Sequence, residues 1–530
     1  MRYRSTIIAV LVLLASLPLA AANSGSVTAK TKTIAAFKNG LGFFLQEGEA
    51  NLTDGWAVSE ALPAAALGTY WVGSAKAGVS VERLVALQED ETKTVPAASI
   101  QEMLEANVGK FVSLTVGDKL IEGKLTAAPS TVALIETPRG TVAVNKNSIS
   151  WVQFAGTADA NRSVTEKVKR LKFKINGAKD KAPVTIGYLQ KGITWSPAYL
   201  VELLDNGKAR LTMQGLLAND VEDIDGADVY FVVGYPNFMF ANILSPLTLT
   251  QSVTDFVQSL SNPQQPRYGM YGGMVQAQMT ANYAGYDYEA AAPRADFGYS
   301  TGTETPGAPE EDLFLYQIKD ASLKKGERAY YTVFTAEVPY EHIYEWAVPD
   351  SSGVQPNGYV ETNMRPEQIS PENQVWHKLR LTNSSKYPWT TAPGMAISNG
   401  QPLSQDMLAY TPKGAKGDLK VTIATDIKAD QSEVETGRVP DALKGYNWSY
   451  TKVTSDGELT VKSFKTRPVT VTIKKTLIGE VVTASDDGKV QKVTKGLKAV
   501  NPTSVITWDV PLKPGEQKKV SYTYFTYVRY

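Results

Sequence analysis

Alternation of apolar and polar residues over Gly192–Phe238 constrains the fold of this chain more than any other feature. Trp195, Pro197 and Tyr199 occupy every second position, and two further alternating runs follow, separated by Asn219-Asp-Val-Glu-Asp223. A period of two is the pattern of strands that bury one face. The segment therefore predicts antiparallel sheets joined by short turns, which is typical of a β-sandwich.

Length and composition exclude several classes of protein. The chain has 530 residues, which predicts more than one domain. Lys+Arg and Asp+Glu both number 54, so no net field attracts nucleic acid and no nucleic-acid partner is expected. There are no cysteines, which excludes disulfides, thiol catalysis and cysteine metal sites.

The first 22 residues have the pattern of a secretory signal peptide. Arg2 and Arg4 precede the apolar run Thr6–Ala15, and Ala20-Ala21-Ala22 offers a small-x-small cleavage site. The run is shorter than the roughly 20 residues that a membrane-spanning helix needs. We therefore expect an exported protein of a bacterial periplasm or cell surface, with no transmembrane helix after signal cleavage.

The sequence predicts a mainly β, multidomain protein with β-sandwich domains, a small SH3- or Sm-like barrel and few short helices. The expected order is a signal peptide, an N-terminal β domain, the small barrel, a central β-sandwich and a C-terminal β-sandwich. These segments cover, in the same order, residues 1–22, 23–97, 98–157, 158–430 and 431–530.

The barrel prediction rests on five short strands with glycines near their turns. The strands are expected at Phe111–Val116, Leu120–Ala127, Thr131–Glu136, Gly140–Val144 and Ile149–Phe154. A short helix over Ala98–Ala106 precedes them, with Ser99 as its cap and Glu102 three residues later. Two more short helices are expected at Ser163–Leu171 and Val253–Leu260.

Residues 262–311 form a low-complexity insertion within the central sandwich. The segment is rich in Pro, Gly, Tyr, Ala, Met and Gln and has no periodicity. Such a composition favours a solvated disordered loop, and a tyrosine-rich tether that binds a partner is the alternative.

Several motifs resemble the domain-of-unknown-function 4139 family, a group of secreted bacterial proteins that includes mucoidy-inhibitor-A-like proteins. The matching pieces are Trp195, Pro197 and Tyr199; Asn219, Glu222 and Asp223; Gly234, Pro236 and Asn237; Phe37–Leu41; Leu379–Asn383 with Trp389 and Pro393-Gly394; and Leu512–Gly515. The turn departs from the family's Gly-Glu-Asp-Trp, because this chain has Val221-Glu-Asp-Ile224. The resemblance implies a β-sandwich architecture and an exported location, and it implies no activity.

Five carboxylates form the densest acidic cluster of the sequence, and their hard oxygens suit calcium. They are Asp220, Glu222, Asp223, Asp225 and Asp228. The calcium-loop pattern of an EF-hand fails, because Val221 and Val232 take its first and last ligand positions. The alternative is an acidic turn that closes a hairpin at Asp223–Gly226. No cofactor other than possible calcium is expected.

The sequence singles out no catalytic residue. His342 and His377 lack any zinc-site spacing and are expected on strand faces. Gly298, Ser300 and Gly302 match the spacing of a nucleophile elbow, but they lie in the low-complexity segment, without the strand and helix that the elbow needs. Nothing singles out a pair of carboxylates either.

The alternating aromatic residues of Tyr522–Tyr530 leave two structures open. They fit the closing strand of a sandwich, and they are also similar to the last strand of an outer-membrane barrel.

The expected function is that of an envelope-associated, non-enzymatic interaction or structural module, with an envelope protein or glycan as partner. One alternative is a hydrolase that acts on envelope glycan or peptide, so an enzymatic role stays open. The other alternative is a calcium-stabilised adhesin.

Overall fold

The computed structural model describes residues 25–234, 236–261, 308–310, 313–360, 373–445, 448–494 and 499–529. The expected signal peptide, most of the low-complexity segment and the elbow-like Ser300 lie outside these residues. The structure is 66 % strand and 5 % helix, which confirms the mainly β, multidomain prediction. The described residues divide into two compact units. Unit 1 takes residues from 1–32, 43–190 and 238–264, and unit 2 takes residues from 33–42, 191–237 and 265–530.

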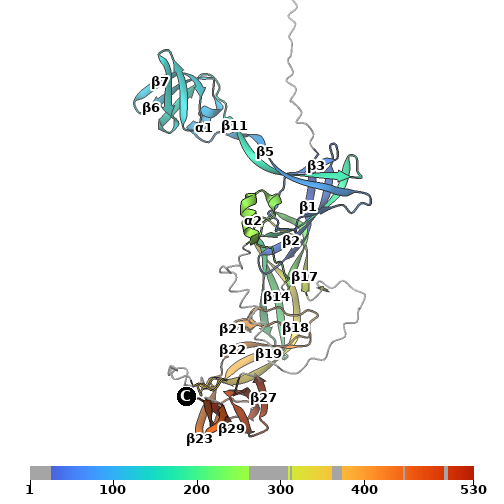
Figure 1. Ribbon diagram of the computed structural model, residues 1–530, viewed down its shortest axis with the longest axis vertical. Coiled ribbons are helices and arrows are strands. Elements are labelled where there is room, and N and C mark those ends of the chain that lie inside the picture. The colour runs from blue at the N-terminus through green and yellow to red at the C-terminus, as the bar shows by residue number, and fades with distance from the viewer. Residues whose placement is uncertain are drawn as a thin grey trace, which may run out of the picture. The chain divides into compact units, whose positions relative to one another are not determined.

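Unit 1 contains short sheets and a long two-stranded ribbon (Figure 1). One sheet is built from part of β1 (Val27–Ala36), β2 (Leu41–Asn51), β12 (Lys181–Lys191) and β4 (Trp71–Gly73). The other has the order β3-β11-β5, with bounds Trp56–Ser59, Asn161–Asn176 and Ser80–Pro96.

The ribbon consists of β5 and β11, which pair from Ser80 opposite Asn176 to Pro96 opposite Asn161. The helix expected at Ser163–Leu171 is therefore wrong, because this segment lies inside β11. Its valines recur at a spacing close to that of a helix. The hydrogen bonds that β11 forms with β5 along its whole length outweigh this local preference for a helix.

A five-stranded antiparallel sheet lies between β5 and β11 in the sequence. Its strands confirm the five short strands expected after residue 110. Helix α1 (Ile100–Ala106) begins at Ser99, whose hydroxyl accepts a hydrogen bond from Glu102 N at 3.2 Å. Leu104, Leu114 and Ile135 lie in the hydrophobic core of this sheet and α1, and this core includes no residue of β5 or β11. The sheet order is β10-β6-β7-β8-β9, with bounds Ile149–Phe154, Phe111–Val116, Lys119–Ala127, Val132–Thr137 and Gly140–Asn145, and a short 3-10 helix, η1, covers Lys146–Ser148.

The end of unit 1 contains η2 (Pro246–Thr248) and α2 (Val253–Ser261), and α2 confirms the helix expected at Val253–Leu260. Among the described residues, no helix is long and apolar enough to cross a membrane.

Unit 2 begins with a central sandwich of two sheets. One sheet has the order β21-β20-β13-β14-β18, with bounds Gln401–Leu408, Ala392–Ser398, Ile193–Leu203, Lys208–Asn219 and Arg328–Val348. The other contains β16 (Ala308–Glu310), β17 (Leu313–Leu323), β15 (Ile224–Val233) and residues 33–36 of β1.

The alternating motif of the sequence forms the core of this central sandwich. Trp195, Pro197 and Tyr199 are buried on one face of β13. The ring of Trp195 stacks on Phe231 of β15 at 4.8 Å and meets Tyr316 of β17 edge-on. The indole Nε1 of Trp195 donates to Val232 O at 3.0 Å. Aromatic residues from both sheets therefore hold the two layers together.

The acidic segment does not close a hairpin, in contrast to the alternative weighed from the sequence. Strand β14 pairs with β13 and β18, whereas β15 pairs with β1 and β17. The segment between them thus crosses from one sheet to the other, and the buried Asn219 fixes this turn by donating to Glu222 O at 2.6 Å. An alternating pattern on both sides of a turn is compatible with either connection, because both need a buried face.

The C-terminal sandwich shares β18 with the central one. The last residues of β18 pair with β19 (Trp376–Thr382) and β25 (Val469–Ile478). The same sheet includes β22 (Lys416–Ile423), β28 (Thr503–Leu512) and β27 (Lys489–Thr494). The facing sheet has the order β23-β24-β29-β26, with bounds Ile427–Gly445, Trp448–Ser463, Gln517–Val528 and Glu480–Ala484.

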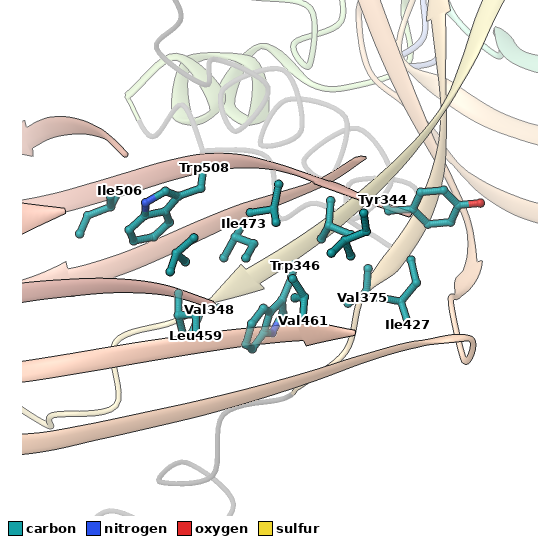
Figure 2. Close-up of a cluster of buried hydrophobic side chains, with 14 of the residues drawn as sticks. Tyr344, Trp346, Val348, Val375, Ile427, Leu459, Val461, Ile473, Ile506 and Trp508 are labelled. Atoms are coloured by element: carbon teal, nitrogen blue, oxygen red, sulfur yellow. The ribbon is translucent and has the colours of Figure 1, made fainter. Parts of the chain in front are cut away.

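Figure 2 shows the hydrophobic core of the C-terminal sandwich, with Trp346 and Trp508 among aliphatic side chains from several strands. The aromatic C-terminal segment forms β29, which pairs with β24 and β26 and buries Tyr522 and Tyr524. The boundary expected after residue 430 falls inside β23, because the sandwich also uses β18, β19 and β22.

Candidate functional site

A solvent-open cavity of about 230 Å³ lies in the C-terminal sandwich. Its lining is partly apolar and partly polar. Five valines form an apolar wall, and hydroxyl and charged side chains form the rest. The lining residues are Ser352, Val354, Val360, Glu433, Val434, Glu435, Arg438, Val453, Ser455, Tyr524, Thr526 and Val528.

Thr526 contributes the unusual polar group of this cavity. The residue is 3 % exposed, and in the described part of the chain its Oγ1 has no hydrogen-bond partner. Leaving a buried hydroxyl unpaired costs on the order of 1–3 kcal/mol. Thr526 lies on β29 opposite Val453 of β24, so two neighbouring strands fix its position.

Glu433 is one of the lining residues and accepts hydrogen bonds on both of its carboxylate oxygens. Tyr524 OH donates to Glu433 Oε1 at 2.6 Å, and Tyr522 OH donates to Oε2 at 2.7 Å. The ammonium of Lys475, a fully buried residue, lies 3.3 Å from Oε2. Burial alone would raise the pKa of Glu433, but the Lys475 charge and these hydrogen bonds outweigh it and hold the pKa below its usual value.

Asp350 is a second carboxyl group near this network. Burial raises the pKa of Asp350, and the charge of Glu433 adds to the rise. Ser352 Oγ donates to Asp350 Oδ2 at 2.7 Å. The two carboxyl groups therefore have pKa values shifted in opposite directions, a pattern that active sites use for acid and base roles.

The two histidines lie on strands, as expected, but the structure also brings them together. His342 Nδ1 on β18 and His377 Nε2 on β19 are 2.9 Å apart. Partial desolvation, followed by the charges of Arg467 and Lys465, lowers the pKa of His342. Burial and the neighbouring His342 lower the pKa of His377 to about 4. Both shifts favour the neutral imidazole.

Lys38 is a half-buried residue in the central sandwich of unit 2. Its Nζ donates to Thr390 Oγ1 at 2.6 Å and lies 5.1 Å from the ring centroid of Trp195. Burial lowers the pKa of Lys38 to about 7. In the described residues no carboxylate forms an ion pair with it, so desolvation is not offset by a counter-charge.

The five acidic residues predicted as a calcium site do not converge. Asp220 pairs with Arg328 at 2.9 Å, and Asp223 Oδ1 accepts from Lys325 N at 2.9 Å. Asp228 accepts from Gln317, and Asp225 is exposed on β15. The backbone oxygen of Glu222 accepts from Asn219. Within the described ranges, no three His, Cys, Asp or Glu side chains form a group that could hold a metal. Calcium binding gains no support from this arrangement.

Sequence reasoning missed Thr526, Glu433 and the histidine pair. Glu433 and Tyr524 are separated by 91 residues and the histidines by 35. No short motif spans such distances, because strand register decides these contacts. Alternation in β29 does place Tyr522, Tyr524 and Thr526 on one face, which is the only signal that the sequence offers.

Comparison with known proteins adds no assignment. The chain matches no protein-family model, and no curated protein matches it. The resemblance to the domain-of-unknown-function 4139 family therefore stays a prediction.

Proposed function

We propose that this chain is an exported, envelope-associated binding protein without enzymatic activity, and that the C-terminal cavity takes up its ligand. The proposal rests on the buried, unpaired hydroxyl of Thr526 at the cavity wall. A polar group that costs stability in the free protein is explained by a ligand that completes its hydrogen bond.

The lining favours a sugar ring of an envelope glycan as the ligand. A sugar presents apolar C–H faces and many hydroxyl groups, which complement the valines and the polar wall of the cavity. The cavity is smaller than the roughly 300–1,000 Å³ of typical drug-sized sites, which fits a single ring. Glu435 and Arg438, which pair at 2.8 Å, lie at the half-exposed part of the lining and offer further hydrogen bonds.

The exported location that this proposal needs rests on the signal-like residues 1–22 and on the resemblance of the β13–β15 motifs to secreted bacterial proteins. The disulfide-free composition is compatible with a bacterial envelope.

The first test compares Thr526→Val with Thr523→Val. Valine keeps the shape of threonine and removes its hydroxyl. Thr523 lies on the other face of β29, where its Oγ1 donates to Asp456. We expect the full chain to bind isolated cell-wall glycan in co-sedimentation, Thr526→Val to weaken binding at least tenfold, and Thr523→Val to leave it unchanged.

The same substitution also has an expected effect on stability. Thr526→Val removes an unpaired buried hydroxyl and should raise the free energy of unfolding by about 1 kcal/mol. Denaturant unfolding of both variants measures this effect. Equal glycan binding by Thr526→Val and the parent chain, or no binding by either, would contradict the proposal.

A glycan hydrolase is the second candidate, favoured by the opposite pKa shifts of Asp350 and Glu433. If the protein is a hydrolase, it should release new reducing ends from cell-wall glycan, and Asp350→Asn should abolish this release. The contacts of Glu433 with Tyr522, Tyr524 and Lys475 argue against it, because both oxygens of the carboxylate are already engaged.

A further inference from the structure

Two imidazoles meet across the β18–β19 strand pair, away from the lining of the cavity. The chain contains two histidines, and both take part. Tyr344 lies directly opposite His377 in the antiparallel register, and His342 is two residues before Tyr344 on the same strand face. The ring centroids of the two histidines are 5.0 Å apart, with 30° between their planes.

We propose that His342 and His377 form a binding site for a divalent transition-metal ion, with Nδ1 of His342 and Nε2 of His377 as ligands. Imidazole nitrogen is a good ligand for Cu²⁺, Ni²⁺ and Zn²⁺. No further His, Cys, Asp or Glu of the described chain joins them in a group of three, so water completes the coordination.

The separation of the two nitrogens indicates which metal fits. Bonds from imidazole nitrogen to such metals are about 2.0–2.1 Å long. Two such bonds at a right angle place the nitrogens about 2.9 Å apart, and a tetrahedral angle places them about 3.3 Å apart. In the metal-free chain a hydrogen bond holds the two nitrogens 2.9 Å apart, so an ion with a right angle between its ligands requires the smaller change in their separation. The site should therefore prefer Cu²⁺ or Ni²⁺, which adopt square or tetragonal geometry, over tetrahedral Zn²⁺.

Neighbouring side chains orient both rings. Tyr344 stacks on His377 with centroids 5.1 Å apart, and Tyr340 meets the edge of His342 at 5.3 Å. Figure 2 shows Tyr344 at one end of the hydrophobic core, so a buried side chain supports the ring of His377. His342 is exposed, which gives an ion access from solvent. Metal binding replaces the hydrogen bond between the two nitrogens, and the broad terminal torsion of histidine lets each ring turn on its tyrosine so that both lone pairs meet at one ion.

The charges around the pair limit its affinity. Lys465 and Arg467 are close enough to lower the pKa of both histidines. The ammonium of Lys465 lies 3.2 Å from Asp426 Oδ2, which offsets part of its charge. A dication therefore binds less tightly here than at a site with carboxylate ligands.

The test uses the untagged full chain, because a histidine tag would supply competing imidazoles. Calorimetric titration with CuCl₂ should show one site per chain, and electron paramagnetic resonance should show coupling to two imidazole nitrogens. His342→Gln and His377→Gln keep a polar side chain of similar size. Each should weaken Cu²⁺ binding at least tenfold, and the double variant defines the background.

Glu341→Gln is the matched control, because Glu341 precedes His342 but points to the other strand face, where it lies 3.7 Å from Lys416. It should leave Cu²⁺ binding unchanged. Thermal melts without metal check that each variant is folded. Cu²⁺ affinity that is unchanged in both single histidine variants, or Zn²⁺ binding tighter than Cu²⁺ binding, would overturn the proposal.

Discussion

At the scale of single residues, Lys38 shows how partial burial changes the chemistry of an ordinary side chain. Its amine contacts Thr390 and the face of Trp195, and burial lowers its pKa to about 7. The unfolded chain keeps a lysine pKa near 10.4. Between these two values the unfolded state binds more protons than the folded state, so stability rises with pH.

Lys38→Met should abolish this pH dependence. The free energy of unfolding of the parent chain minus that of the variant should increase between pH 7 and pH 9.5, by up to about 1.4 kcal/mol per pH unit. Below pH 7 the difference should be constant, because the amine is then protonated in both states. Urea unfolding at several pH values measures it, with the exposed Lys208→Met as the control. A difference that is flat from pH 6 to pH 9.5 would show that the amine is hydrated.

At the scale of strands, the packing of β14 against β15 depends on a missing side chain. A Cβ on Gly215 would lie 2.3 Å from Cε2 of Phe231, whose ring is fully buried against Trp195. Phe231 cannot move without disturbing that stack, since the core around it is closely packed.

Gly215→Ala should therefore destabilise unit 2 by about 1–3 kcal/mol, as overpacked cores do. The denaturation midpoint measures this loss, and near-ultraviolet circular dichroism reports on the surroundings of Trp195. Gly437→Ala is the control, because its Cβ would meet its nearest neighbour, Thr454, at an ordinary 3.7 Å. Equal stability of the two variants would mean that the layers separate easily at this point.

Strand and helix positions could largely be predicted from the sequence where the pattern is local. The five strands that follow α1 and the Ser99 cap were predicted because turn glycines and capping residues act over a few positions. Residues 163–171 were predicted wrongly, because their valines fit a helical spacing and only pairing with β5 makes them a strand. The acidic turn was placed correctly, but its connection between two sheets depends on the partners of β14 and β15.

At the scale of the whole molecule, the five-stranded sheet is an insertion with a core of its own. The chain leaves the ribbon at Ala97 and returns at Ala160, and Ala97 N donates to Ala160 O at 2.8 Å. The two ends of the insertion are therefore as close together as the two strand ends that a hairpin turn connects.

Replacing residues 98–159 by Asn-Gly should leave the remaining chain folded, because this dipeptide favours a two-residue hairpin turn. Pairing of β5 with β11 does not need the inserted core, since their hydrogen bonds run between the two strands alone. Amide hydrogen exchange should show unchanged protection in unit 2. A loss of protection in its sandwiches would show that the insertion contributes to their folding.

The sequence by itself determined the β class, the position of most strands, the disulfide-free cores and the buried face that includes Trp195 and Tyr199. These follow from composition and from contacts between residues a few positions apart. Tertiary structure alone decided that Glu433 bonds to Tyr522 and Tyr524, that Thr526 lines a cavity with its hydroxyl unpaired, and that the two histidines touch. The physical reason is that strand register, set by the packing of whole sheets, joins residues that no local pattern relates.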